Sequence, residues 1–200
     1  MSFDLLMSRR TESLAVSKYA LIESAVHLFA KSGFSQTTTA QIAQHAGYSH
    51  GMLFTHFSSR IRLVEAAIET MGAKITDALY SIRGTSSLEE ALAAHIDAIE
   101  KNGALYRSLL HELHGLPRAS QRIWLGIQSA ASHHLGTIVA QEQTEGKLKR
   151  IEHALLFNTW LGLLHHYLAN EVMFAPRGHV LTKMKTILIG HFLTLVRESI

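Results

Sequence analysis

Hydrophobic residues recur mostly at intervals of three and four along the chain, which is the spacing of an amphipathic helix. Ile22, Ala25, Val26 and Phe29 mark the first such face, and Gly33 follows as a helix stop. Strand-like alternation is scarce and no internal repeat is visible. The pattern therefore predicts an all-α fold.

Start and stop signals divide the chain into about nine helices. Thr38 with Gln41, and Ser86 with Glu89, each have the spacing of a capping box, in which a side chain and a backbone N–H satisfy each other at a helix start. The predicted helices cover about 17–32, 39–46, 50–57, 60–83, 86–101, 104–114, 118–146, 147–170 and 179–198.

The second and third predicted helices are short and are joined by a three-residue turn, Gly47-Tyr48-Ser49. Ser49 is expected to cap the third helix, in which Leu53 and Phe57 face inward. Two short helices around a glycine-containing turn are typical of a helix-turn-helix unit. Its second helix would place its N-terminal half in the major groove of DNA.

The run from Tyr19 to Ile68, about a quarter of the chain, resembles the DNA-binding region of the tetracycline-repressor (TetR) family. The similarity rests on matching residue types at matching spacings: Phe29, Gly33-Phe34, Thr38-Thr39, Ile42-Ala43, Ala46-Gly47, Ser49, Gly51, Leu53, His56-Phe57 and Arg60. Chain length and the helix number agree with that family.

The resemblance implies roles for individual residues. Thr38 would cap its helix, Thr39 would contact a phosphate, and His56 and Arg60 would contact phosphates as well. The residues expected at the bases are His50, Gly51, Met52 and Thr55. The family usually has lysine where this chain has His50 and tyrosine where it has Phe54. Both differences weaken phosphate binding, and Phe54 either faces DNA or packs internally.

The resemblance also implies two domains: a DNA-binding domain over residues 1–60, with its core at about 17–58, and a ligand-sensing and dimerisation domain over 61–200. A homodimer reading a pseudo-palindromic operator is the usual arrangement. The last two helices would form the interface, although packing within one protomer explains part of their hydrophobicity. The candidate interface residues are Leu156, Leu163, Tyr167, Met184, Ile187, His191 and Leu195.

A small-molecule effector of unidentified chemistry would bind among the middle and C-terminal helices and shift the helix over 60–83 that enters the DNA-binding domain. Aromatic surfaces with a few polar groups are typical of such pockets. The candidate lining residues are Tyr106, His111, Trp124, Phe157 and Trp160, and core packing is the alternative for each.

Composition and charge agree with a DNA-binding globular protein. Hydrophobic residues make up 47% of the chain, the net charge is +3, and residues 1–60 carry five basic against three acidic residues. Arg9 and Arg10 are further candidate DNA contacts. The chain has no cysteine, which excludes disulfides and thiolate catalysis. We find no signal peptide or membrane span, and we expect a cytoplasmic protein.

Three other function classes were weighed. Fourteen histidines suggest a metal-responsive regulator, and His111 with His114 have the best spacing, but no carboxylate cluster completes a site. No catalytic motif or phosphate-binding loop indicates an enzyme, and we expect no cofactor. A helical scaffold without DNA binding would leave residues 38–57 unexplained. The resemblance therefore implies a transcriptional regulator, and it favours a repressor that a small molecule releases from its operator.

Overall fold

The computed structural model describes the backbone of residues 2–81 and 87–198, with side chains from residue 12 onward except that of residue 13. Within these residues the fold is all-helical, as predicted, and contains no β-strand. The helices are α1 (Ser2–Ser32), α2 (Thr39–His45), α3 (His50–His56), α4 (Arg60–Tyr80), α5 (Leu88–Lys101), α6 (Gly103–Glu112), the 3-10 helix η1 (Leu113–Gly115), α7 (Arg118–Thr144), α8 (His153–Ala169), α9 (Glu171–Phe174) and α10 (Val180–Val196).

Three helix starts differ from the prediction. Helix α1 begins at Ser2 rather than near Ser17. Ser17 lies inside this helix, where its hydroxyl donates to the Leu14 carbonyl, and so it does not cap a helix start. The Ser86–Glu89 capping box is wrong. Ser86 lies outside the described residues, and Ser87 with Glu90 forms the box instead.

The third wrong helix start is that of α8, which begins at His153 and not at Lys147. Gly146 has a positive φ of 72°, and the chain then runs extended beside the end of α10. There the N–H of Lys149 donates to the Val196 carbonyl at 2.8 Å. This backbone pairing, which joins distant segments, leaves no signal in local spacing. The four-residue helix α9 was also not predicted.

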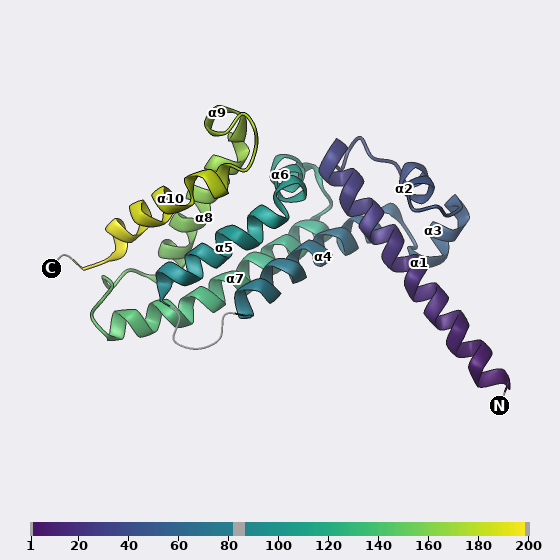
Figure 1. Ribbon diagram of the computed structural model, residues 1–200, viewed down its shortest axis with the longest axis horizontal. Helices are drawn as coiled ribbons and strands as arrows, with labels where there is room; N and C mark the ends of the chain where they lie inside the picture. The colour runs from purple at the N-terminus through teal and green to yellow at the C-terminus, as the bar shows by residue number, and fades with distance from the viewer. Residues whose placement is uncertain (1, 82–86, 199–200) are drawn as a thin grey trace.

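Helix α4 runs from the small N-terminal helices into the C-terminal bundle (Figure 1), where it lies alongside α7. Its buried stripe continues along almost its whole length: Leu63, Val64, Ala67, Ile68, Met71, Ile75 and Leu79. Leu63, at the start of this stripe, and Leu79, at its end, belong to the same hydrophobic core. The helix-turn-helix unit and the bundle are therefore joined by shared packing.

Helices α4 and α7 approach closely at Gly72. A Cβ atom placed on Gly72 would overlap the Ile127 Cδ1 atom of α7. Glycine at this position therefore sets the distance between the two helices. Gly126, also on α7, has no neighbour within 4 Å of its Cβ position and serves as a control.

Replacing Gly72→Ala should destabilise the protein by about 1–3 kcal/mol, because a methyl group must be forced into a filled contact. Gly126→Ala should stabilise it by up to about 1 kcal/mol through helix propensity. Urea unfolding followed by circular dichroism measures both. Equal midpoints for the two variants would contradict the close contact.

Candidate functional site

Helices α2 and α3 form the predicted helix-turn-helix unit, with both helix starts capped. The Thr38 hydroxyl accepts from the N–H of Gln41 at 3.2 Å, and the Gln41 side chain accepts from the N–H of Thr38 at 2.8 Å. The turn passes through Gly47 at φ 76°. Ser49 then accepts from the N–H of Met52 at 3.1 Å. The capping box at Thr38 and the cap at Ser49 are thus confirmed.

The outer face of α3 is exposed while its inner face is anchored by Leu53, which is fully buried. His50 contacts the Thr39 hydroxyl at 2.9 Å, so the starts of α2 and α3 meet at the surface. Phe54 is 46% exposed and packs edge-on against the His50 ring. An exposed phenylalanine in this position is available to an outside partner and is not core.

The segment that forms this unit carries charged side chains of one sign. The sequence contains no aspartate or glutamate between Ser24 and Val64, whereas it contains Lys31, Arg60, Arg62 and four histidines there. A segment without carboxylates favours a polyanion. The unit therefore offers both the shape and the potential that DNA requires.

Two of the basic residues also make contacts inside the protomer. The His56 ring lies 2.7 Å from the Ser17 hydroxyl of α1, which fixes α3 against α1. The Arg60 guanidinium donates to the carbonyls of Phe34 and Thr37 in the loop between α1 and α2. Arg60 thus positions the start of α2, a role that the sequence did not reveal.

The same loop is held from the other side by Glu112, the last residue of α6. Its carboxylate accepts from the backbone N–H groups of Phe34 at 2.7 Å and Ser35 at 2.8 Å. Desolvation raises the pKa of Glu112, but the hydrogen bonds from Ser35 and Phe34 and the charge of Arg60 outweigh it and lower the pKa overall. Sequence reasoning missed Glu112, since its partners are 77 and 78 residues away.

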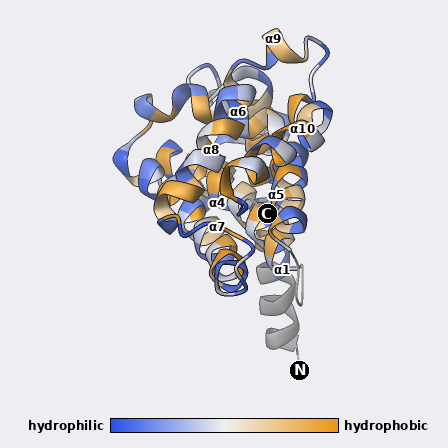
Figure 2. Cartoon of the chain, turned by 90° about the vertical axis from the view of Figure 1, so that its left-hand side faces the viewer, coloured by the Kyte–Doolittle hydropathy of each residue, from blue (hydrophilic) through white to orange (hydrophobic). Residues whose placement is uncertain are grey.

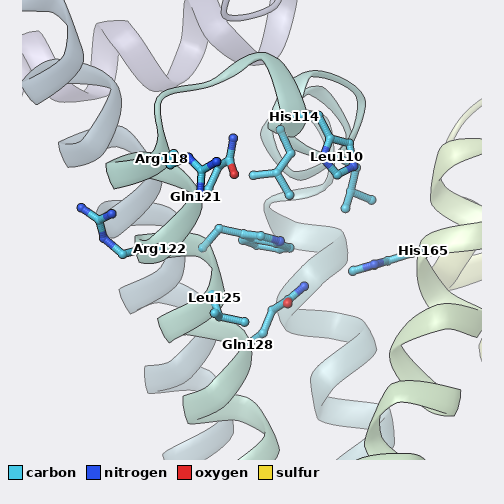
Figure 3. Close-up of a pocket in the computed structure, with 10 residues that line it drawn as sticks. Leu110, His114, Arg118, Gln121, Arg122, Leu125, Gln128 and His165 are labelled. Carbon is cyan, nitrogen blue, oxygen red and sulfur yellow. The ribbon is translucent and has the colours of Figure 1, made fainter.

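A cavity of about 580 Å³ opens between α6, η1, α7 and α8. Figure 3 shows Arg118 and Gln121 on the α7 side, Arg122 directed outward from the same helix, and His165 extending from α8 toward the cavity. The volume lies in the range of small-molecule sites. Its lining residues are Leu110, Leu113, His114, Arg118, Gln121, Arg122, Trp124, Leu125, Gln128 and His165.

Behind the cavity lies a buried group of aromatic and histidine side chains. The Tyr106 hydroxyl lies 2.9 Å from His165 Nε2, and Trp160 donates to His95 Nδ1 at 3.2 Å. Burial lowers the pKa of His95 to about 4, helped by the nearby His165 and His134, and burial also lowers the pKa of His165 to about 4. Both imidazoles are therefore neutral at pH 7.

The outer faces of α8 and α10 expose large hydrophobic side chains. Leu155 and Ile187 are each 60% exposed, and Leu195 is 46% exposed. Gly162 and Gly190 have open space at their Cβ positions, so another backbone could approach there closely. Figure 2, which views the molecule from the left-hand side of Figure 1, shows hydrophobic segments along both helices.

Comparison with known proteins identifies the helix-turn-helix unit. The family model described as "Bacterial regulatory proteins, tetR family" matches residues 21–67, which run from the second half of α1 into α4. Residues 21–67 therefore form a DNA-binding domain of the type found in TetR-family regulators.

Curated relatives match the N-terminal part of the chain, where the helix-turn-helix unit lies. A helix-turn-helix-type transcriptional repressor of Mycobacterium tuberculosis is 34% identical over 76 residues, which are 38% of this chain and 40% of the relative. The regulator TtgR of Pseudomonas putida is 38% identical over 66 residues, 32% of this chain and 31% of TtgR. The chain thus spans less than half the length of the curated relatives it matches.

Solved structures match almost the whole chain, at identities that show likeness of fold alone. FadR of Bacillus subtilis, in complex with stearoyl-CoA, has a TM-score of 0.75 at 18% identity and covers 88% of this chain and 97% of its own. A TetR-family regulator of Rhodococcus sp. has a TM-score of 0.76 at 17% identity, covering 90% of this chain and 97% of its own.

The predicted DNA-contact residues gather around one end of the molecule. The residues that are largely exposed there are Thr38, Ser49, His50, Gly51, Phe54 and Thr55, while Thr39, Met52, His56 and Arg60 are half-buried. Arg9 and Arg10 lie outside the residues whose side chains are described.

The predicted pocket residues are not brought together. Trp124 lines the cavity, and Tyr106 lies behind it against His165. Phe157 and Trp160 are buried in the core, and His111 is exposed, so none of these three lines the cavity. Hydrophobic spacing cannot separate a lining aromatic from a core aromatic, because both lie on the inner face of a helix.

The predicted interface residues fall into two groups. Leu156 is 3% exposed and packs inside the protomer, so its assignment to a dimer interface is corrected. Ile187, His191 and Leu195 are exposed on α10, and Leu163, Tyr167 and Met184 are half-buried.

The part of the chain that the structure describes contains no group of three or more histidine, aspartate or glutamate side chains that could hold a metal ion. None of its helices combines the length and hydrophobicity needed to cross a membrane.

Stability should fall as the pH drops from 6.5 through about 4, because His95 and His165 stay neutral in the folded state but take up protons in the unfolded chain. The stabilisation is fully present above pH 6.5 and is lost below the lowered pKa values.

His165→Gln keeps a hydrogen-bonding partner for Tyr106 and should make the decline of stability with falling pH shallower. Urea midpoints at pH 7.5, 5.5 and 4.5 measure it, with the exposed His191→Gln as control. Identical declines in all three proteins would refute the assignment.

Proposed function

We propose that this chain is a transcriptional regulator that binds operator DNA as a homodimer and is released by a small molecule. The observation that carries the proposal is the exposed outer face of α3, held on a rigid and capped helix-turn-helix unit in a segment without carboxylates. In this arrangement α3 is the recognition helix, with His50, Met52 and Thr55 toward the bases.

Phosphate binding in this proposal falls to Thr39 and to the N-terminus of α2, where backbone N–H groups point outward. Arg60 acts mainly by shaping the α1–α2 loop, since its guanidinium is already bonded to carbonyls there. Residues 1–60 form the DNA-binding domain and residues 61–200 the sensing and dimerisation domain, and the protein acts in the cytoplasm.

Repression relieved by an effector is the mode we propose. A Mycobacterium tuberculosis relative is named a repressor, and the FadR neighbour was solved with stearoyl-CoA. The names of the relatives favour a regulator over an enzyme or a scaffold. The ligand of FadR is that protein's own, and it supports here the presence of an effector without identifying one.

Specific DNA binding should be found with a duplex taken from beside the protein's own gene. We expect an affinity on the order of nanomolar, at least a thousandfold tighter than for an unrelated duplex, and weaker at higher salt. Fluorescence anisotropy at two salt concentrations measures both. Absence of binding to any duplex at low salt would refute the regulator and favour a scaffold.

His50→Ala and Met52→Ala should each weaken specific binding by about 1–3 kcal/mol, while leaving binding to unrelated DNA nearly unchanged. Thr39→Ala should weaken binding to both duplexes, because it removes a phosphate contact. Arg150→Ala is the matched control, since Arg150 is an exposed basic residue between α7 and α8, far from the helix-turn-helix unit. An equal loss in Arg150→Ala would mean that only overall charge matters.

Dimerisation should depend on the exposed faces of α8 and α10. Leu155→Glu combined with Ile187→Glu places charges on that face without touching the core, because both side chains are 60% exposed. We expect a monomer in light scattering, with an intact circular dichroism spectrum and loss of operator binding. Val172→Glu with Met173→Glu is the control, since these exposed residues lie on α9. A dimer that persists in the first variant would place the interface elsewhere.

A further inference from the structure

The cavity between α6, η1, α7 and α8 has a charged mouth and an uncharged interior. Arg118 and Arg122 lie one helical turn apart on α7 and are both exposed. Neither forms an ion pair with any other residue that the structure describes. His114 of η1 is also exposed there, and no aspartate or glutamate lines the cavity.

Deeper inside, the lining loses its charge. Trp124 is 4% exposed and lies between Tyr106 and His165, with ring centroids 4.9 Å and 6.2 Å away. His165 is neutral at pH 7 because burial lowers its pKa to about 4, so it adds no cation to the interior. Leu110 and Leu113 complete an apolar wall.

We propose that this cavity binds an amphipathic anion, with its acidic group at Arg118, reinforced by the positive charge of Arg122 one helical turn away, and its apolar body against Leu110, Leu113 and Trp124. Guanidinium groups bind carboxylates and phosphates through paired hydrogen bonds. A lipophilic cation is disfavoured, since it would meet two arginines and no carboxylate. This inference gives a ligand class to the effector and rests on the proposed function only for its regulatory meaning.

The position of the cavity also supplies a path to the DNA-binding domain. Leu110, Leu113 and His114 line the cavity, and Glu112, within the same turn, holds the N–H groups of Phe34 and Ser35. A ligand that displaces the α6–η1 turn therefore pulls on the loop that starts α2. Glu112 acts here as a positioning residue and does not touch the ligand.

Calorimetric titration of the DNA-free protein tests the ligand class. The probes share one alkyl chain and differ in the head group: dodecanoate, dodecyl phosphate, dodecan-1-ol and dodecylammonium, all below their micelle concentrations. We expect either anion to bind at least about tenfold more tightly than the alcohol, and the cation more weakly still. Preference for dodecanoate or for dodecyl phosphate then separates a carboxylate from a phosphate ligand.

Two variants locate the site. Arg118→Gln with Arg122→Gln should reduce anion affinity to that of dodecan-1-ol and leave alcohol binding unchanged, which also shows that the variant is folded. Arg177→Gln with Arg150→Gln removes the same charge from exposed positions outside the cavity and should have no effect. Equal binding of alcohol and anion by the unmodified protein, or an unchanged anion preference in the first variant, would overturn the proposal.

The variant Glu112→Gln separates binding of the anion from release of the protein from operator DNA. It should bind the preferred anion as the unmodified protein does, but require several-fold more of it to leave operator DNA. Glu89→Gln, an exposed carboxylate at the start of α5, is the control. Unchanged release in Glu112→Gln would remove Glu112 from the path and leave the ligand class standing. Because the titrations contain no DNA, their result is independent of whether an operator is found.

Discussion

The fold depends on the burial of α4 from end to end. Leu63 and Val64 at its start pack with the helix-turn-helix unit, and Ile75 and Leu79 near its end pack in the bundle, all within one hydrophobic core. Close packing of this kind transmits displacement because neighbouring side chains have no free volume to absorb it. A boundary near residue 60 therefore separates two functions and not two independently packed bodies.

Glu112 and Arg60 add a polar connection to this apolar one. They hold the α1–α2 loop from two sides, the carboxylate through N–H groups and the guanidinium through carbonyls. The bundle is therefore connected to the helix-turn-helix unit in two ways. The first connection is the hydrophobic core along α4, and the second is the α6–η1 turn, which lines the cavity and carries Glu112.

The helix-turn-helix unit was predictable because its signals are local. Thr38 and Gln41 are three residues apart, and Ser49 caps the helix that follows it directly. The start of α5 was predicted wrongly at Ser86 with Glu89, and the structure uses Ser87 with Glu90, which have the same spacing. The second register is selected by a distant contact, since the N–H of Leu88 donates to Glu142 of α7 at 2.8 Å. The cavity, Glu112 and the inward role of Arg60 depend on such contacts as well, so spacing alone could not reveal them.

Glu112 binds the peptide N–H groups of Phe34 and Ser35. Every amino acid except proline has that N–H group. Position 35, whose side chain is exposed, can therefore be substituted without losing this backbone contact, although the Ser35 side chain also contributes to the lowered pKa of Glu112. Position 112 has no such freedom, because a shorter or uncharged side chain loses one or both bonds. Substitutions in the DNA-binding domain would therefore leave the backbone contact with Glu112 intact. DNA specificity could then diverge while the response to the effector is retained.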